Sequence, residues 1–334
     1  MSHTIKLLEG PARSWYSTLI DQVLADHVEI PCRQGLGLES PDALSAIIPG
    51  ANSVAAALAT VDLPRRGDSR ARTTFSILYS LRRILGYHET VLHDRYPILA
   101  RYTPAVTTPH FARSISYFRE SVPNDVIHEP WVTRADTSSG PRYSIDQFQR
   151  AVCLLSATPQ TRRALIDFGE GFKARCVLSW LFLIRNGNMR IHQNLRSNDL
   201  VVGMPNDLID ARTGQIVLAA ITGTTIGELH HHASLIQIYR RDIAGIDTVA
   251  ELSRMDFSST TLPAIEVRIR NTPIVAELES IAAPWLGRPL QDPSEGMRRW
   301  RTIMTSIEAL FWKYNPQCSA DNRQCVDHLI GRYA

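Results

Sequence analysis

The chain has 334 residues, 44% of them hydrophobic, which is enough to bury the core of one large or two modest domains. Its formal net charge of only +3 gives little support to a general role in binding nucleic acid. The odd and scattered set of five cysteines argues against a disulfide framework, and the sequence lacks both an apolar membrane span and a secretory signal. We therefore expect a cytoplasmic protein without membrane or nucleic-acid partners.

Arginine dominates the basic residues. Of 36 basic residues only Lys6, Lys173 and Lys313 are lysines. Such a bias is typical of a GC-rich genome, but arginine also forms a rigid fork that binds phosphate or carboxylate. The two explanations are compatible.

The first half of the chain contains separate stretches that predict helices, and residues 40–125 are hard to assign from the sequence. Apolar spacing predicts a helix over residues 11–27, and the glycine-punctuated stretch 29–40 predicts a loop or hairpin. Further helices are predicted over residues 74–92 and 111–120. Residues 138–168 then predict a turn, a helix, a break at Pro159 and a strand.

Patterns typical of β-structure follow residue 175. Residues 176–197 consist of two apolar stretches around an Asn-Gly turn, which is a strong hairpin signal. Periodicity predicts helices over residues 207–222 and 293–312, and strands over 233–242 and 264–270. Together these elements predict a single α+β domain.

Cys176 is the first residue with chemical interest. A cysteine at the start of an apolar strand is commonly an inert core residue. Here, however, Lys173 and Arg175 favour a thiolate, and the hairpin returns Arg196 and Ser197 to the same region. A nucleophile beside an anion-binding pair suits a phosphorylated substrate. A cysteine hydrolase would need a histidine base, and none stands out near Cys176.

The stretch from Cys176 to Tyr239 resembles the thymidylate synthase superfamily, whose signature runs from a nucleophilic cysteine to R-S-x-D-x-x-x-G-x-P-x-N. The twenty-residue interval from Cys176 to Arg196 is the family's interval, and the motif is matched by Arg196, Ser197, Asp199, Gly203 and Pro205. Tyr239 matches the family's H-x-Y, with Gln237 in place of the histidine. The resemblance implies that these residues bind the nucleotide, with Asp199 and Gly203 on the folate side.

The resemblance also implies a fold. It predicts a thymidylate synthase-like domain over residues 1–334, in which a large mixed sheet packs against helices and pairs with a second sheet in a homodimer. Extra length within about 40–125 is expected to be an insertion, and about 280–334 a helical extension.

Weaker matches extend the predicted site. Arg33 resembles the ligand of a phosphate loop, and Arg162 and Arg163 resemble arginines that reach the phosphate in the partner protomer's site. Tyr143, in a G-P-x-Y match, is expected beside the pyrimidine among the catalytic residues. Trp131 is expected on the folate side.

Asp207 stands where thymidylate synthases have asparagine. A carboxamide can accept from uracil N3–H and donate to O4, whereas cytosine presents an acceptor at N3 and an amino donor at N4. A carboxylate accepts from N4–H and, when protonated, donates to N3. Asp207 therefore predicts a cytosine nucleotide, the alternative being an ordinary acid near a helix N-terminus.

The activity implied is 5-hydroxymethylation by 5,10-methylenetetrahydrofolate. Cys176 would add to pyrimidine C6, and an acid would orient the water that completes the reaction. Glu89 is preferred for this role and Glu120 is the alternative. Gln237 favours CMP over dCMP, as in the cytidylate hydroxymethylases of mildiomycin-type antibiotic biosynthesis. A dCMP hydroxymethylase, a thymidylate synthase and a non-catalytic nucleotide-binding relative remain alternatives.

Three consecutive histidines, residues 230–232, invite a metal interpretation. Neighbouring residues of an extended segment point to opposite faces, and no cysteine or carboxylate stands at ligand spacing nearby. The two C-terminal cysteines, Cys318 and Cys325, have no second pair for zinc. We therefore expect no metal site.

Overall fold

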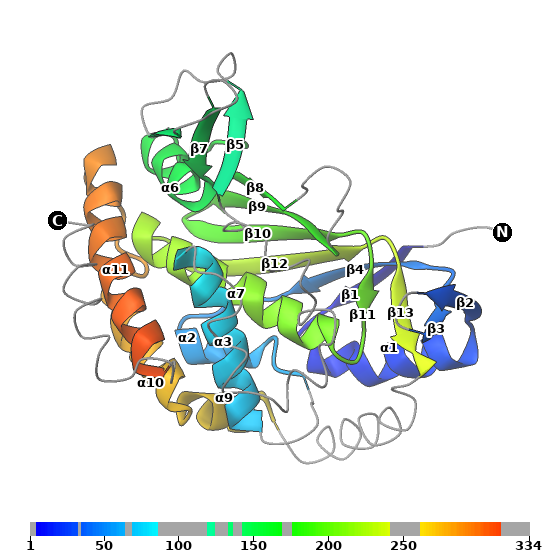
Figure 1. Cartoon of the computed structure of the whole chain (residues 1–334). Coiled ribbons are helices and arrows are strands. Elements are labelled where there is room, and N and C mark those ends of the chain that lie inside the picture. The colour runs from blue at the N-terminus through cyan, green and yellow to red at the C-terminus, as the bar shows by residue number, and fades with distance from the viewer. Residues whose placement is uncertain are drawn as a thin grey trace.

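A six-stranded mixed sheet forms the centre of the molecule (Figure 1). The computed structural model describes residues 5–32, 35–63, 69–85, 119–123, 133–135, 142–168, 176–240 and 261–314. In spatial order the strands are Ile5–Glu9 (β1), Ala43–Ile48 (β4), Thr225–Ala233 (β12), Asn188–Leu195 (β10), Val177–Arg185 (β9) and Leu165–Asp167 (β8). The pairs β1–β4 and β10–β12 are parallel, and the other pairs are antiparallel.

Two smaller sheets flank the central one. One joins Asn198–Asp199 (β11), Ile236–Tyr239 (β13), Gly35–Glu39 (β3) and Val28–Cys32 (β2). The other joins Arg119–Pro123 (β5), Arg142–Asp146 (β7) and Thr133–Ala135 (β6). Because β11 follows β10 almost directly and pairs with β13, the motif that begins at Arg196 is fixed between two sheets.

Helix α7 (Gly203–Thr222) is buried along nearly its whole length. Figure 1 shows other helices gathered around it on one side of the large sheet. The remaining helices are Arg13–Ala25 (α1), Val54–Ala59 (α2), Ser69–Leu85 (α3), Gln147–Ala157 (α6), Leu262–Arg270 (α9), Pro273–Ala282 (α10) and Pro293–Tyr314 (α11). A helix that is buried on all sides is stable only inside such a shell.

A buried arginine fixes α7 on the sheet. Arg212 is fully buried and donates to the carbonyl oxygens of Pro49 at 2.8 Å and Gly227 at 2.9 Å. It also donates to Gln215 Oε1 at 2.7 Å, and burial lowers the pKa of its guanidinium to about 9. The network satisfies polar groups that would be costly to leave unpaired.

In the part of the chain that the structure describes, helices cover one face of the large sheet and leave the other face open. Along β10 and β12 buried residues alternate with half-buried ones, the pattern of a sheet that packs on one side only. The open face is defined by half-buried side chains that lie in register on adjacent strands: Ser45, Ile47, Leu181, Leu183, Arg190, His192, Asn194, Glu228, His230 and His232. This face carries both apolar and histidine side chains.

Most predicted elements of the second half are confirmed. The hairpin turns at Asn186 and Gly187, whose φ angles of 52° and 73° are those of a two-residue turn that favours Asn-Gly. The helix predicted from residue 207 begins earlier, at Gly203, with Pro205 in its first turn, where its missing N–H is tolerated.

The strand predicted over residues 264–270 is wrong, because these residues form α9. Apolar residues at alternate positions produced the sequence pattern of a strand. Pro263 is at the helix start, and Ile265 and Ile269, four residues apart, are buried, while Val267 is 59% exposed. The helix predicted over residues 111–120 is wrong at its C-terminal end, because residues 119–120 lie in β5.

No helix in the described part of the chain combines the length and apolar character needed to cross a membrane.

Candidate functional site

The two ends of the β9–β10 hairpin bring Cys176 beside the Arg-Ser pair. The carbonyl of Cys176 accepts a hydrogen bond from the Arg196 backbone N–H at 2.9 Å. Ser197 Oγ donates to Cys176 Sγ at 3.6 Å. The structure therefore brings Cys176 together with Arg196 and Ser197, which follow it in the sequence by twenty and twenty-one positions.

The environment of Cys176 raises the pKa of its thiol. Desolvation by the surrounding protein is the largest cause, and the carboxylates of Asp207 and Asp199 add to it, while the Ser197 hydrogen bond and the Arg196 charge act in the opposite direction. Cys176 is nevertheless exposed and open to a ligand. The thiol is therefore mainly protonated at neutral pH, and two acids and one arginine lie within electrostatic reach of it.

Asp207, in the second turn of α7, is held by neighbouring amides. Its Oδ2 accepts from Asn198 Nδ2 at 2.8 Å, and its backbone carbonyl accepts from Gln193 Nε2 at 3.1 Å. Gln193 Oε1 in turn lies 2.9 Å from Nδ1 of the fully buried His231. Burial, assisted by His232, lowers the pKa of His231 to about 3, so this imidazole is neutral. Asn198 thus orients the carboxylate of Asp207, and a separate polar chain from Gln193 to His231 holds its backbone carbonyl.

Sequence reasoning did not find Asn198, Gln193 or His231. A signal was present in Gln193, a polar residue at an inward position of β10 between Ile191 and Leu195. Buried polar side chains are hydrogen-bonded, so a glutamine at such a position indicates a partner.

Asp199 has a local structural role. Its carboxylate accepts the backbone N–H groups of Val201, Val202 and Gly203 at 3.1, 3.3 and 3.4 Å. These groups belong to the start of α7, where an acid satisfies unpaired donors and favours the helix dipole. Asp199 therefore fixes the helix that presents Asp207.

Gln237 and Tyr239, expected at the sugar, are joined to one another. Both are buried on β13, and Gln237 Nε2 donates to Tyr239 Oη at 2.6 Å. The carbonyl of Gln237 accepts from Leu200 N–H at 3.0 Å, which ties β13 to the segment before α7.

The other predicted site residues are placed less completely. Arg162 and Arg163 are exposed between α6 and β8. Tyr143 lies on β7 and Glu120 on the adjacent strand β5, where the backbone alone is described. Arg33, Glu89 and Trp131 lie outside the described residues.

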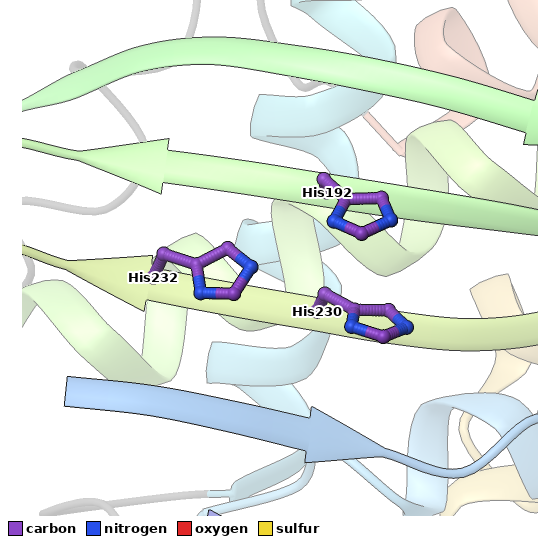
Figure 2. Close-up of side chains that lie close together, drawn as sticks. All are labelled: His192, His230 and His232. Carbon is purple, nitrogen blue, oxygen red and sulfur yellow. The ribbon is translucent and has the colours of Figure 1, made fainter. Parts of the chain in front are cut away.

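The consecutive histidines divide between the two faces of the sheet, as expected for a strand. His231 points into the core, while His230 and His232 lie on the open face, where His192 of β10 joins them (Figure 2). The rings of His192 and His230 stack with centroids 4.3 Å apart. Burial, followed by the neighbouring histidines, lowers the pKa of His192 to about 4. The sequence analysis missed this cluster because its third member comes from another strand.

An α+β domain with an accessible cysteine beside an Arg-Ser pair is typical of enzymes that act on phosphorylated substrates through a thiol. Residues 118–280, just under half of the chain, match the family model for thymidylate synthase. The matched range contains Cys176, the motif from Arg196 and Tyr239; it does not extend to Arg33 or Glu89. No curated protein matches the chain.

The family indicates the class of reaction. Its members transfer a one-carbon unit from methylenetetrahydrofolate to a nucleotide. Folate-dependent one-carbon transfer is accordingly the reaction class that the family match indicates.

Proposed function

We propose that this protein hydroxymethylates C5 of CMP. The reaction consumes CMP, 5,10-methylenetetrahydrofolate and water, and it yields 5-hydroxymethyl-CMP and tetrahydrofolate. Both the nucleotide and the folate are substrates in this proposal. Deoxy-CMP is the alternative nucleotide.

The observation that carries the proposal is the pairing of Cys176 with Asp207. Ser197 donates to Cys176 Sγ and the next residue, Asn198, donates to Asp207 Oδ2, so adjacent residues of one segment link the thiol to the carboxylate. Asn198 donates to Oδ2 of Asp207, which holds the carboxylate as a hydrogen-bond acceptor. An acceptor at this place suits the N4 amino group of cytosine and opposes the O4 carbonyl of uracil.

The chemistry begins with the formation of a bond between Cys176 Sγ and C6 of the ring. The electron pair of the C5–C6 bond becomes available at C5, which attacks the methylene carbon of the folate. C5 then loses its proton and tetrahydrofolate leaves, so an exocyclic methylene remains. Water adds to this methylene, Cys176 is expelled and the ring double bond is restored.

The protein contributes charge and position to each step. Arg196 binds the phosphate as a fork, and the Ser197 hydroxyl stabilises the thiolate that must form. Asp207 stabilises the amino edge of the ring as charge develops at N3. Glu89, or Glu120, orients the water.

A homodimer completes the proposed site. The open face of the large sheet includes Leu181 and Leu183, and two such faces would cover each other's apolar side chains. In that arrangement Arg162 and Arg163 bind the phosphate in the partner's site. Arg33 supplies a further phosphate contact, with Tyr143 at the pyrimidine and Trp131 at the folate.

The test is release of tritium from C5 of labelled CMP in the presence of methylenetetrahydrofolate. We expect turnover with the wild type and with Cys153→Ala, because Cys153 is a half-buried cysteine remote from the proposed chemistry. Cys176→Ala should reduce turnover by at least about 1,000-fold, because covalent addition is lost. Nucleotide binding without tritium release by the wild type would show a non-catalytic relative and defeat the proposal.

A further inference from the structure

We propose that His192, His230 and His232 form a binding site for a divalent transition-metal ion, with Zn²⁺ as the expected occupant. The three side chains are half-buried on the open face of the large sheet, and each offers a ligand nitrogen within 4.8 Å of the others. They come from adjacent strands, and His192 lies directly opposite His230 in the β10–β12 register. Three histidines with an open fourth position are an established donor set for zinc.

The rings require only a small adjustment to hold an ion. Tetrahedral zinc with Zn–N bonds of ~2.1 Å places its ligand nitrogens about 3.4 Å apart. The ligand nitrogens of the cluster lie within 4.8 Å of one another. Rotation of the side chains can close the difference between this distance and the spacing around zinc. Figure 2 shows all three rings on the same side of their strands, so the side chains share the space in which an ion would lie.

Neighbouring side chains already select the nitrogens for such an ion. Ser45 Oγ lies 2.9 Å from Nδ1 of His232, which leaves Nε2 of that ring for a metal. Glu228 Oε2 lies 3.1 Å from Nε2 of His230, which leaves Nδ1. Partners of this kind, a carboxylate above all, orient metal-bound histidines and increase their basicity.

The charges around the cluster permit a cation. Arg190 is a nearby positive charge that would repel a cation, but it is paired with Glu228 at 3.4 Å. The site uses none of the residues of the proposed reaction, but it lies on the open face that the proposed homodimer covers, so an ion there would lie at the interface between protomers.

The experiment measures metal binding by untagged full-length protein that has been stripped with a chelator. A Cys176→Ser background removes the exposed thiol as a competing ligand. Zn²⁺ bound after equilibrium dialysis is counted by elemental analysis, and Co²⁺ is followed by visible absorption. We expect one ion per chain and a tetrahedral Co²⁺ spectrum without thiolate charge transfer.

Substitutions assign the site. His192→Asn and His232→Asn should each weaken Zn²⁺ binding by more than about 100-fold, and Ser45→Ala by about 10-fold, in line with the loss of a ligand and of its supporting contact. His27→Asn is the matched control, because His27 lies outside the cluster beside the Leu24 carbonyl, and it should bind like the parent. Circular dichroism verifies that each variant is folded. A parent that binds no Zn²⁺, or a folded His192→Asn variant with unchanged affinity, would overturn the proposal.

Discussion

Single residues control the reactivity of Cys176 in opposing directions. The Ser197 hydroxyl stabilises the thiolate, whereas Asp207 destabilises it. Ser197→Ala should therefore raise the pKa of the thiol further, and Asp207→Asn should lower it. The rate of alkylation by iodoacetamide against pH, followed on the Cys176 peptide by mass spectrometry, measures both shifts.

Cys153 in the same samples is the internal control, because its alkylation profile should not change with either substitution. Equal profiles for Cys176 in all three proteins would mean that neither side chain acts on the sulfur.

The identity of residue 207 should decide which base is used. Asp207→Asn restores a group that can pair with uracil, so turnover of CMP should fall by at least about 100-fold while activity toward UMP or dUMP increases. Asn198 can still donate to the new amide oxygen, so its contact survives the change. Tritium release from each labelled nucleotide gives the ratio of CMP turnover to UMP or dUMP turnover. Undiminished CMP turnover in Asp207→Asn would contradict recognition of the base by this residue.

The sequence predicted the contact of Cys176 with Ser197 because the Asn-Gly turn fixes the hairpin register. It could not predict the amides behind Asp207. The Gln193–His231 contact depends on how β10 pairs with β12, and the Gln193–Asp207 contact on how α7 packs against the sheet. Both contacts depend on tertiary packing, which leaves no pattern in the local sequence.

At the scale of elements, β12 makes stability depend on pH. His231 titrates near 6.5 in an unfolded chain and at about 3 in the fold, because its ring is buried. The unfolded state therefore binds more protons below pH 6.5, and the contribution of neutral His231 to stability is lost as the pH falls toward 3. We expect the free energy of unfolding to fall by roughly 1 kcal/mol per pH unit from this residue alone.

Denaturant unfolding at a series of pH values between 7 and 4 measures the slope. His231→Gln should have a shallower slope even though its stability at pH 7 is lower, whereas His27→Gln should keep the wild-type slope. An unchanged slope in His231→Gln would show that this histidine is not the group being titrated.

Helices and strands could be predicted where the sequence fits only one periodicity. Helix α11 and the β9–β10 hairpin follow directly from periodicity and turn chemistry. Helix α9 did not, because three alternating apolar residues fit a strand as well as a short helix, and the burial that decides between them comes from the helices it packs against. Among the described residues strand β1 pairs with β4 alone, and no local sequence pattern predicts this pairing.

At the scale of the whole molecule, the open face predicts self-association. Leu183→Glu places a charge among the half-buried side chains of this face and should shift the protein from dimer to monomer in analytical ultracentrifugation. Activity should fall with it, because Arg162 and Arg163 would no longer reach a partner's site. The matched change Val267→Glu, at an exposed position of α9, should leave the dimer intact.

Complementation provides the second half of this test. Cys176→Ala and Arg163→Ala are expected to be weak alone and to recover activity when mixed, because one site of the mixed dimer is then complete. A wild-type monomer, or a mixture without recovery, would contradict a site shared between protomers.

The most direct test of the account is the mass of the product. The protein is incubated with methylenetetrahydrofolate and, separately, with CMP, dCMP, UMP and dUMP, and each nucleotide is analysed by mass spectrometry. We predict that CMP gains one CH₂O unit and that the uracil nucleotides are unchanged. Methylated dUMP, with both cytosine nucleotides unaltered, would contradict the reading of cytosine by Asp207.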